Sequence, residues 1–426
     1  MLWIAQTARV LGDWCLRMFA VFELARRFAV SESAGWYLVT AVFTLPFIVL
    51  APFNGAISNG LPKHRVLAVA AASSALVLLA LLALEQLDAP VLIAGLMLVA
   101  LGAAVFNPTR YALLPAVAED TGLPLTRVNG GMELGAVLGI LGGVICACAV
   151  QGSAWFQRPP ALLLAIGASV LAALCALAAD FPSDVRRPER PWQAMQGFFR
   201  DTRRVWGDST SREAQLALAS FLGLVTAGSG AMVMHALRPE AGGDYLLVVQ
   251  AMLVVSVGTA LGSCLAGWPG DLRRSLGFVP MGALGLLLAL TWAAVATAVE
   301  PGLPLLPCAF LGFTSGLANV PLRAAYQAAI PADARGNGMA VANFAIYVTT
   351  TALSVLMLLL AQVGWLATPL DQLTFLAFVA AGGAGVVGWW LRREVGELLA
   401  PLLRGRGRLP TPMLTEASSS QTDEAR

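Results

Sequence analysis

The chain has 426 residues, of which 58% are apolar and only 12% are charged, and its mean hydropathy is +0.74. This composition excludes an ordinary soluble globular protein, in which about a quarter of the residues are charged. The formal net charge of +2 gives no indication of nucleic-acid binding. The composition predicts an all-α integral membrane protein.

Twelve apolar segments are long enough to cross a bilayer, which takes roughly 20 helical residues. With the chain divided at prolines, glycines and charge clusters, the predicted spans are residues 2–27, 34–58, 65–86, 90–116, 126–150, 160–180, 213–236, 244–268, 275–298, 303–329, 335–363 and 370–391. Charged residues interrupt the first segment, and no small-residue cleavage site follows it. It is therefore interpreted as a span and not as a signal peptide.

One long polar connection, residues 181–212, divides the spans six to six. The expected organisation is a six-helix half at 1–180, a cytoplasmic Arg-rich linker at 181–212, a second six-helix half at 213–393, and a disordered cytoplasmic tail at 394–426. With the N-terminus in the cytoplasm, 19 basic residues lie inside and four outside. Because basic loops stay in the cytoplasm, both termini are predicted to be cytoplasmic.

A short motif recurs in both halves. Pro108-x-Arg110 is followed by Asn129-Gly130, and Pro321-x-Arg323 is followed by Asn337-Gly338. Parallel repeats of six spans resemble the architecture of the major facilitator superfamily, in which substrate binds near the midplane between the halves.

Helical spacing places polar side chains on common faces of several spans. The expected stripes are Asn107, Arg110 and Tyr111 in span four; Asn129 and Glu133 in span five; Asn319, Arg323 and Gln327 in span ten; and Asn343, Tyr347, Thr350 and Thr351 in span eleven. Span one adds Arg9, Asp13 and Arg17. The prolines at 46, 52, 108 and 321 are expected to bend or break their helices.

Ionisable groups inside a membrane are functional by default, so Asp13, Arg110, Glu133 and Arg323 are predicted to bind substrate. The alternative is that they form structural ion pairs, Asp13 with Arg17 or Arg110 with Glu133. Arg9 and Arg17 are also open to interpretation as snorkelling residues near the helix ends. His235 is interpreted as a structural polar group.

The sequence lacks the residues that several kinds of enzyme and binding site require. The only lysine is Lys63, so no nucleotide-hydrolysing P-loop exists. The six cysteines contain no Cys-x-x-Cys motif, are accompanied by only two histidines and are interpreted as small core residues. No cofactor, metal site or enzymatic activity is expected. Any transport is secondary or passive, with Asp13 and Glu133 as candidate ion-coupling residues.

Longer stretches resemble one family. LGDWCLRMFAVF, LGAAVFNPTRYALLP, RVNGGMELGAVLGILGG, NVPLRAAYQ and GNGMAVANFA are similar to the lysophospholipid transporters of bacterial inner membranes. The resemblance implies movement of lysophospholipid, chiefly lysophosphatidylethanolamine, to the cytoplasmic leaflet by alternating access. It also implies a cytoplasmic acyltransferase/acyl-carrier-protein synthetase partner, and substrate roles for Asp13, Arg110, Asn129 and Glu133. Since arginine binds phosphate and a carboxylate binds ammonium, Arg110 and Arg323 are predicted to hold the phosphate, and Asp13 and Glu133 the amine.

The sequence departs from this family in two places. In LAPFNGAISNGLPKHRVL, the predicted gating loop with Gly55, Asn59, Lys63 and Arg65, Asn59 stands near a position where the family has an acid. Residues 216–235 also lack the arginine expected in span seven. Two rival functions therefore stay open: transport of another amphipathic solute or drug, and a non-transporting scaffold that recruits a lipid-modifying enzyme through the linker or the tail.

Overall fold

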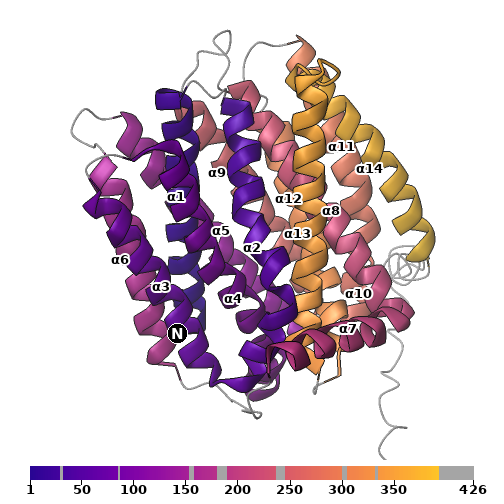
Figure 1. The fold of residues 1–426 in the computed structure, drawn as a ribbon. Helices are drawn as coiled ribbons and strands as arrows, with labels where there is room; N and C mark the ends of the chain where they lie inside the picture. The colour runs from indigo at the N-terminus through magenta and orange to yellow at the C-terminus, as the bar shows by residue number, and fades with distance from the viewer. Residues whose placement is uncertain are drawn as a thin grey trace, which may run out of the picture.

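The computed structural model describes residues 1–28, 32–84, 87–152, 158–179, 190–236, 245–299, 305–331 and 334–392. Long helices run roughly side by side through this part of the chain (Figure 1). The predicted tail at 394–426 and the first part of the predicted linker lie outside the described residues.

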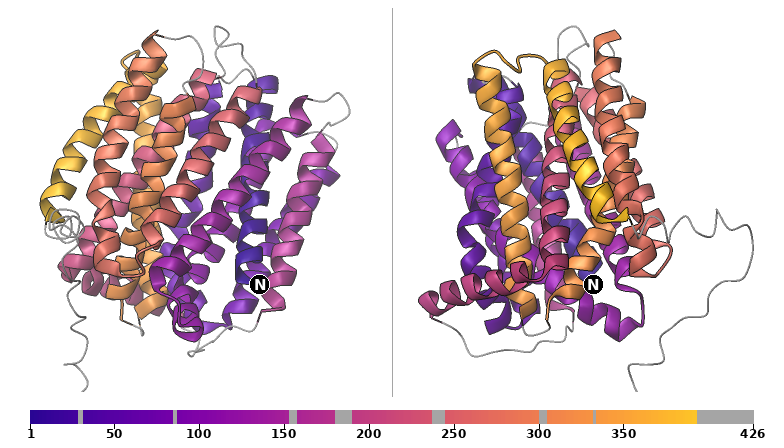
Figure 2. Two further views of the ribbon diagram at one scale, coloured as in Figure 1. Left: turned by 180° about the vertical axis from the view of Figure 1, so that it is seen from behind. Right: turned by 90° about the vertical axis from the view of Figure 1, so that its right-hand side faces the viewer.

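Six helices form the first half. They are α1 (Leu2–Phe28), α2 (Glu32–Gly60), α3 (Lys63–Ala83), α4 (Ala89–Thr121), α5 (Leu125–Gly152) and α6 (Arg158–Leu177). The second half holds α8 (Ser209–Ala236), α9 (Tyr245–Gly267), α10 (Leu272–Leu276), α11 (Phe278–Val299), α12 (Leu305–Ala329), α13 (Arg335–Gln362) and α14 (Pro369–Trp390). The helix α7 (Pro191–Gly207) lies between them in sequence and crosses one end of the bundle (Figures 1 and 2). That end also holds Met1 and is called the linker end below.

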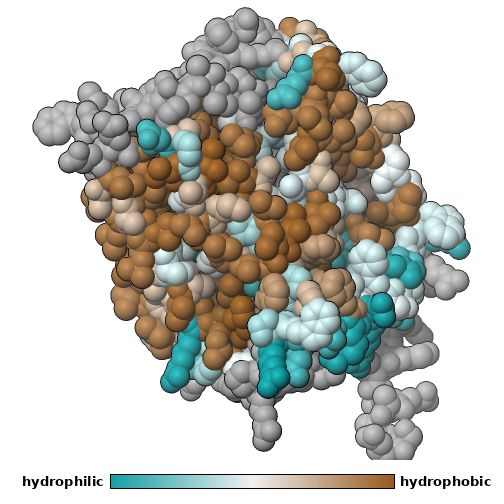
Figure 3. Space-filling model, in the orientation of Figure 1, coloured by the Kyte–Doolittle hydropathy of each residue, from teal (hydrophilic) through white to brown (hydrophobic). Residues whose placement is uncertain are grey.

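Each predicted span coincides with a helix to within a few residues, and the short α10 and the longer α11 share one span. Among the described helices, eleven are long and apolar enough to cross a membrane. The helix α1 is equally long but carries intramembrane charges, and with it the predicted count of twelve is reached. Apolar side chains cover the middle of the molecule, and hydrophilic ones gather mainly along the lower edge (Figure 3). The prediction of an all-α membrane protein is confirmed.

The prediction was that the prolines at 46, 52, 108 and 321 bend or break their helices, and the part of it that concerns breaking is wrong. The helix α2 continues through Pro46 and Pro52, α4 through Pro108, and α12 through Pro321. At Pro108 the reason is visible. A proline lacks the N–H that would bond to the carbonyl four residues earlier, and Asn54 of α2 donates to that carbonyl, Ala104, at 2.9 Å. A neighbouring helix thus supplies the missing donor.

The cysteines are only partly core residues. Cys15, Cys148 and Cys308 are buried as predicted, but Cys146 and Cys175 are half-buried and Cys264 is exposed. For Cys264 the prediction was wrong, because a small apolar residue is equally compatible with a lipid-facing position in a membrane helix. All six cysteines are free.

Candidate functional site

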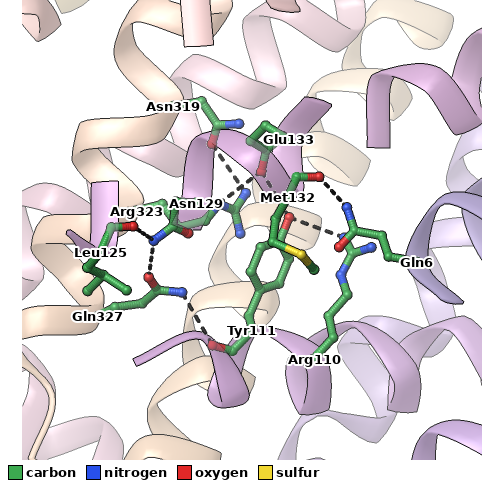
Figure 4. Close-up of polar contacts among 10 residues, drawn as sticks. All are labelled: Gln6, Arg110, Tyr111, Leu125, Asn129, Met132, Glu133, Asn319, Arg323 and Gln327. Carbon is green, nitrogen blue, oxygen red and sulfur yellow. Dashed lines mark hydrogen bonds and ion pairs between the residues drawn. The ribbon is translucent and has the colours of Figure 1, made fainter. Parts of the chain in front are cut away.

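Tyr111 of α4 lies at the centre of a buried polar network between the two halves (Figure 4). Two guanidinium groups lie over its ring, that of Arg110 at 4.5 Å and that of Arg323 at 4.1 Å from the ring centroid. Cations at this distance from an aromatic face are attracted by its quadrupole. The arginines of the two repeated Pro-x-Arg motifs therefore meet at one tyrosine.

The hydroxyl of Tyr111 links charges of both signs. It accepts a hydrogen bond from Arg110 Nη2 at 3.2 Å and donates one to Glu133 Oε1 of α5 at 3.0 Å. The same carboxylate oxygen lies 3.5 Å from Arg323 Nε, and Arg323 also donates to Asn319 Oδ1 at 3.2 Å. Glu133 therefore pairs with Arg323 of the other half, not with Arg110 as the structural alternative had it.

A second pair of contacts joins the halves beside this ion pair. Asn129 Nδ2 of α5 donates to Gln327 Oε1 of α12 at 2.6 Å, and Gln327 Nε2 donates to the carbonyl of Tyr111 at 3.3 Å (Figure 4). That carbonyl is available because Pro115, four residues later, has no N–H to give it. A proline in one half thus creates the acceptor for an amide of the other.

Asp13 is already engaged with its neighbour on α1. Arg9 Nη2 lies 3.1 Å from Asp13 Oδ1 and donates to the carbonyl of Val99 at 3.1 Å. Arg9 is only 1% exposed, so the interpretation that it snorkels is wrong. The structure also pairs Asp13 with Arg9 where the structural alternative had Arg17. An ionised acid inside the protein needs such a partner to offset its lost hydration.

Arg17 lies over aromatic rings. Its guanidinium carbon is 4.4 Å from the Trp14 ring and 5.0 Å from the Phe43 ring, and Nη2 donates to Thr40 Oγ1 at 3.4 Å. These contacts hold the side chain within the bundle. Snorkelling does not describe it.

The stripe on α13 meets the first half as well. Asn107 of α4 donates to the hydroxyl of Tyr347 at 3.2 Å, and the Tyr347 ring lies 3.9 Å from that of Phe47. The hydroxyls of Thr44 and Thr351 are 2.5 Å apart. Asn107 and Tyr111, which share a predicted stripe, thus contact different partners.

The buried network contains more positive than negative charge. Around Tyr111, Arg110 and Arg323 carry two positive charges and Glu133 carries one negative charge, which leaves one positive charge in excess, while Arg9 and Asp13 on α1 form a neutral pair. Both acids are paired with arginines, Asp13 with Arg9 and Glu133 with Arg323. In the described residues no ion pair joins Arg110 to a carboxylate, and its Nε and Nη1 atoms are buried without a hydrogen-bond partner. Arg110 itself is 5% exposed.

Buried donors without partners are rare and costly, particularly on a charged group. The Nε and Nη1 atoms of Arg110 leave two such donors on one planar group. Nε and Nη1 lie on different edges of the guanidinium, so an oxygen of a phosphate or of a carboxylate is a suitable acceptor for either of them. The network therefore has the charge and the free donors to bind an anion. No group of three metal-ligating side chains occurs in the described ranges.

The predicted gating loop lies at the linker end. A Cβ built on Gly55 of α2 would lie 1.5 Å from Asn337 Oδ1 and 2.8 Å from Asn337 Cα of α13, so only glycine permits this approach of the two halves. Asn337 Nδ2 in turn donates to Asp201 Oδ2 of α7 at 2.6 Å. Arg65 is exposed, Lys63 begins α3, and the side chain of Asn59 lies outside the described residues. Arg335 and Glu119 form a further cross-half ion pair of 3.2 Å.

The halves also meet at the opposite end of the bundle. Tyr37 of α2 donates to Gln372 Oε1 of α14 at 3.0 Å. The Trp36 ring packs against Gly230 of α8, where a built Cβ would lie 2.6 Å from the indole nitrogen. His235, near the end of α8, is buried and has interaction partners, in keeping with a structural role. The polar network around Tyr111 therefore lies between the cross-half contacts of the linker end and those of the opposite end.

Sequence patterns gave no sign of several residues that complete this site. Gln6 donates to the carbonyl of Met132, and Asn54 satisfies Ala104 (Figure 4 shows the first contact). A signal does exist for Pro115, since its position four residues after Tyr111 identifies a freed carbonyl within a polar stripe. Gln6 has no such signal, because a single glutamine near a helix end is common.

Comparison with known proteins identifies the family to which this architecture belongs. The family model described as the Major Facilitator Superfamily matches residues 2–354. The fold is similar to that of the proton:xylose symporter XylE, with a TM-score of 0.69 and 14% identity over 92% of this chain and 94% of that one. It is similar to the human organic anion transporter MFSD10 (TETRAN) too, with a TM-score of 0.68 and 15% identity over 91% and 97%.

Relatives by sequence are more specific. The chain is 28% identical over 336 residues to the lysophospholipid transporter LplT of Cronobacter sakazakii (strain ATCC BAA-894), covering 76% of this chain and 78% of that protein. It is 31% identical over 225 residues to LplT of Yersinia pestis (strain Pestoides F), covering 51% and 52%. For the latter, the match spans about half the length of the relative.

Two halves of six membrane spans each, together with the family match, define a multi-pass membrane transporter. The chain belongs to the Major Facilitator Superfamily. Its function is transport and not enzymatic catalysis, as the sequence predicts.

Proposed function

We propose that the protein moves lysophospholipids across the membrane by alternating access, with the head group bound in the network around Tyr111. The observation that carries this proposal is Arg110, a buried cation with two unpartnered donors in a network with excess positive charge. The named relatives are lysophospholipid transporters, which makes a phosphate the anion of interest.

In this proposal the phosphate binds between Arg110 and Arg323, which both lie over the Tyr111 ring. A phosphate oxygen would accept from Nη1 or Nε of Arg110, which lie on different edges of the guanidinium, and the phosphate charge would offset part of the positive excess. Charge-assisted bonds of this kind are roughly twice as strong as neutral ones. Asn107 and Asn129 lie close enough to the network to position the head group through their cross-half hydrogen bonds.

The amine of an ethanolamine head group would bind Glu133 or Asp13 by exchange of partners. Each acid now pairs with an arginine, so a phosphate that neutralises Arg323 would free Glu133 to accept the ammonium group. The same exchange weakens an ion pair that joins the halves. Substrate binding would thereby favour their relative rotation. Asp13 and Glu133 are also the groups proposed to carry a coupling ion.

The proposed setting is the inner membrane of a bacterium, with the linker end and both termini in the cytoplasm, because basic residues concentrate there. Transport would deliver lysophospholipid to the cytoplasmic leaflet. A cytoplasmic acyltransferase/acyl-carrier-protein synthetase is the proposed consumer of that lipid. The residues around Gly55, Lys63 and Arg65 are proposed to gate this side.

The test is movement of labelled lysophosphatidylethanolamine in proteoliposomes, scored by extraction of the outer-leaflet lipid with albumin. Wild type, Arg110→Gln, Arg110→Lys and Asp13→Asn are compared with Arg274→Gln, an exposed arginine far along the chain from the network. Wild type and Arg274→Gln should transport, and Arg110→Gln and Asp13→Asn should not. Arg110→Lys keeps the charge without the planar fork and should retain part of the activity.

Two results would remove the lysolipid assignment. If folded wild type moves no lysolipid, the substrate is another amphipathic solute, to be sought by competition in a solute screen. If Arg110→Gln transports like wild type, the anion site lies elsewhere. Loss of function on deletion of the tail, with Arg110→Gln unaffected, would instead favour the scaffold function.

A further inference from the structure

The helix α7 has two chemically different faces. Its buried residues are Ala194, Gly197, Phe198, Asp201 and Val205. Phe198 packs with Ala51 of α2 and Val341 of α13, and its ring lies 5.9 Å from that of Phe344. One face of α7 is therefore docked on both halves of the bundle.

The opposite face is aromatic and exposed. Trp192 is 62% exposed and Phe199 is 55% exposed. They are seven residues apart, which places them on the same side of a helix. Trp206, seven residues further on, is 39% exposed and donates from its indole nitrogen to Gln215 of α8 at 3.0 Å. Exposed aromatic side chains in one line on a helix form an apolar strip of the kind that marks a membrane or protein contact.

The charge on α7 is distributed unevenly around the helix. Arg200, Arg203 and Arg204 are exposed, and the Arg200 side chain is 77% exposed. The only acid in the helix, Asp201, is buried, where it accepts from Asn337 and also pairs with Arg200 Nε at 3.3 Å. Arg200 and Arg203 therefore outnumber it, and both remain exposed. The outer face is consequently cationic and aromatic. This combination is typical of helices that lie in the head-group region of a bilayer.

The position of α7 fits such a role. It runs across the other helices and projects beyond them in the side view (Figure 2, right). In Figure 3 it lies near the lower edge, where the apolar surface gives way to hydrophilic side chains. Tryptophan and arginine are favoured at that level of a membrane protein, because the ring enters the interface and the cation meets lipid phosphate.

We propose that the outer face of α7, formed by Trp192, Phe199, Arg200 and Arg203, binds anionic phospholipid head groups at the membrane surface. The aromatic rings enter the interface, and the two arginines bind head-group charge. The assignment of this surface to the cytoplasmic leaflet rests on the orientation proposed above. The lipid contact itself does not depend on the transported substrate.

Photo-crosslinking of the full chain tests this proposal. The purified protein is placed in nanodiscs that contain either phosphatidylglycerol or phosphatidylcholine carrying a diazirine near the head group. Crosslinked lipid on the peptide covering residues 190–207 is then quantified by mass spectrometry. Wild type should crosslink phosphatidylglycerol in preference, and high salt should lower that preference because ions screen exposed charges.

The variants distinguish the effect of the arginines on α7 from the effect of the net charge of the whole protein. Arg203→Gln should lower the phosphatidylglycerol preference about fivefold, and Arg200→Gln/Arg203→Gln should lower it further, since each arginine near an anionic surface contributes a comparable factor. The control is Arg127→Gln/Arg274→Gln, which removes the same charge from two other exposed arginines. It should keep the preference.

Equal crosslinking of both lipids in wild type, or an unchanged preference in the double variant, would overturn the proposal. If α7 crosslinks no lipid in nanodiscs and is nevertheless shielded from modification in native membranes, this face binds a protein and not lipid. Crosslinking of α7 to lipid does not require transport, so a negative result in one experiment does not imply a negative result in the other. Wild-type protein that fails to move lysolipid can still show the α7 contact.

Discussion

Arg323 Nε of α12 lies 3.5 Å from Glu133 Oε1 of α5, so a buried ion pair joins the two halves. Both side chains are largely buried, at 7% and 10% exposure. Removing one partner of a buried pair leaves an uncompensated charge, at a cost of roughly 3–5 kcal/mol. This contact is therefore a point at which stability and conformational change are linked.

Loss of either charge alone should destabilise the protein more than loss of both. Glu133→Gln and Arg323→Gln are each expected to lower the melting temperature in detergent, and Glu133→Gln/Arg323→Gln to recover much of the loss. The double variant should nevertheless fail in transport if the pair exchanges partners with substrate. Additive losses in the thermal cycle would show that the two residues do not interact.

Tyr111→Phe is expected to weaken transport without abolishing it. Arg110 and Arg323 would still lie over the ring, but the hydroxyl that connects Arg110 with Glu133 would be gone. Hydrogen bonds to charged groups contribute about 1.5–3 kcal/mol, so a fall in rate of roughly tenfold or more is expected. Tyr111→Ala also removes the cation–π contacts and should be inactive. Equal activity of Tyr111→Phe and wild type would place the hydroxyl outside the transport cycle.

The sequence alone predicted the helices well and the ion pairs poorly. Span positions follow from local apolar length, so each was found to within a few residues. The repeated Pro-x-Arg motif also led to Arg110 and Arg323. Pairing, by contrast, depends on helix rotation: Asp13 is four residues from both Arg9 and Arg17, and spacing cannot choose between them. Arg9 is held in place by the hydrogen bond it donates to the Val99 carbonyl of α4, whereas Arg17 lies over aromatic rings.

The sequence alone also does not predict that α7 packs against the bundle. The sequence predicts a polar connection at residues 181–212, where seven of the 32 residues are arginine. Within them, the small and apolar residues Ala194, Gly197 and Phe198 follow helical spacing and form a buried face. That face docks on surfaces formed by α2 and α13, which are distant in sequence. A linker helix of this kind is stabilised by tertiary contacts more than by its own propensity.

Gly55→Ala should prevent full closure of the linker end. The added Cβ would overlap Asn337, including its backbone, so α2 and α13 must move apart. Closure can be measured by crosslinking Glu119→Cys to Arg335→Cys with a short bifunctional thiol reagent, in a background without the six native cysteines; the pair replaces a cross-half ion pair whose side-chain tips are 3.2 Å apart. Gly55→Ala is expected to slow this crosslink several-fold.

The matched control for Gly55→Ala is Gly167→Ala in α6, where a Cβ meets nothing within 4 Å. Its crosslinking should equal that of the unsubstituted pair. If Gly55→Ala crosslinks at the same rate as this control, the close approach of α2 to Asn337 does not control closure.

The final prediction separates a structural from a substrate role for Asp13. Asp13→Asn leaves Arg9, which is 1% exposed, without its acid, and should lower thermal stability. Loss of transport in that variant alone is therefore ambiguous. Arg9→Gln/Asp13→Asn removes both charges and should restore stability, since a buried pair can be replaced by neutral groups at little cost. If Asp13 binds the head-group amine or a coupling ion, this stable double variant still fails to transport lysophosphatidylethanolamine. Transport by the double variant at the wild-type rate would instead show that Asp13 has a structural role alone.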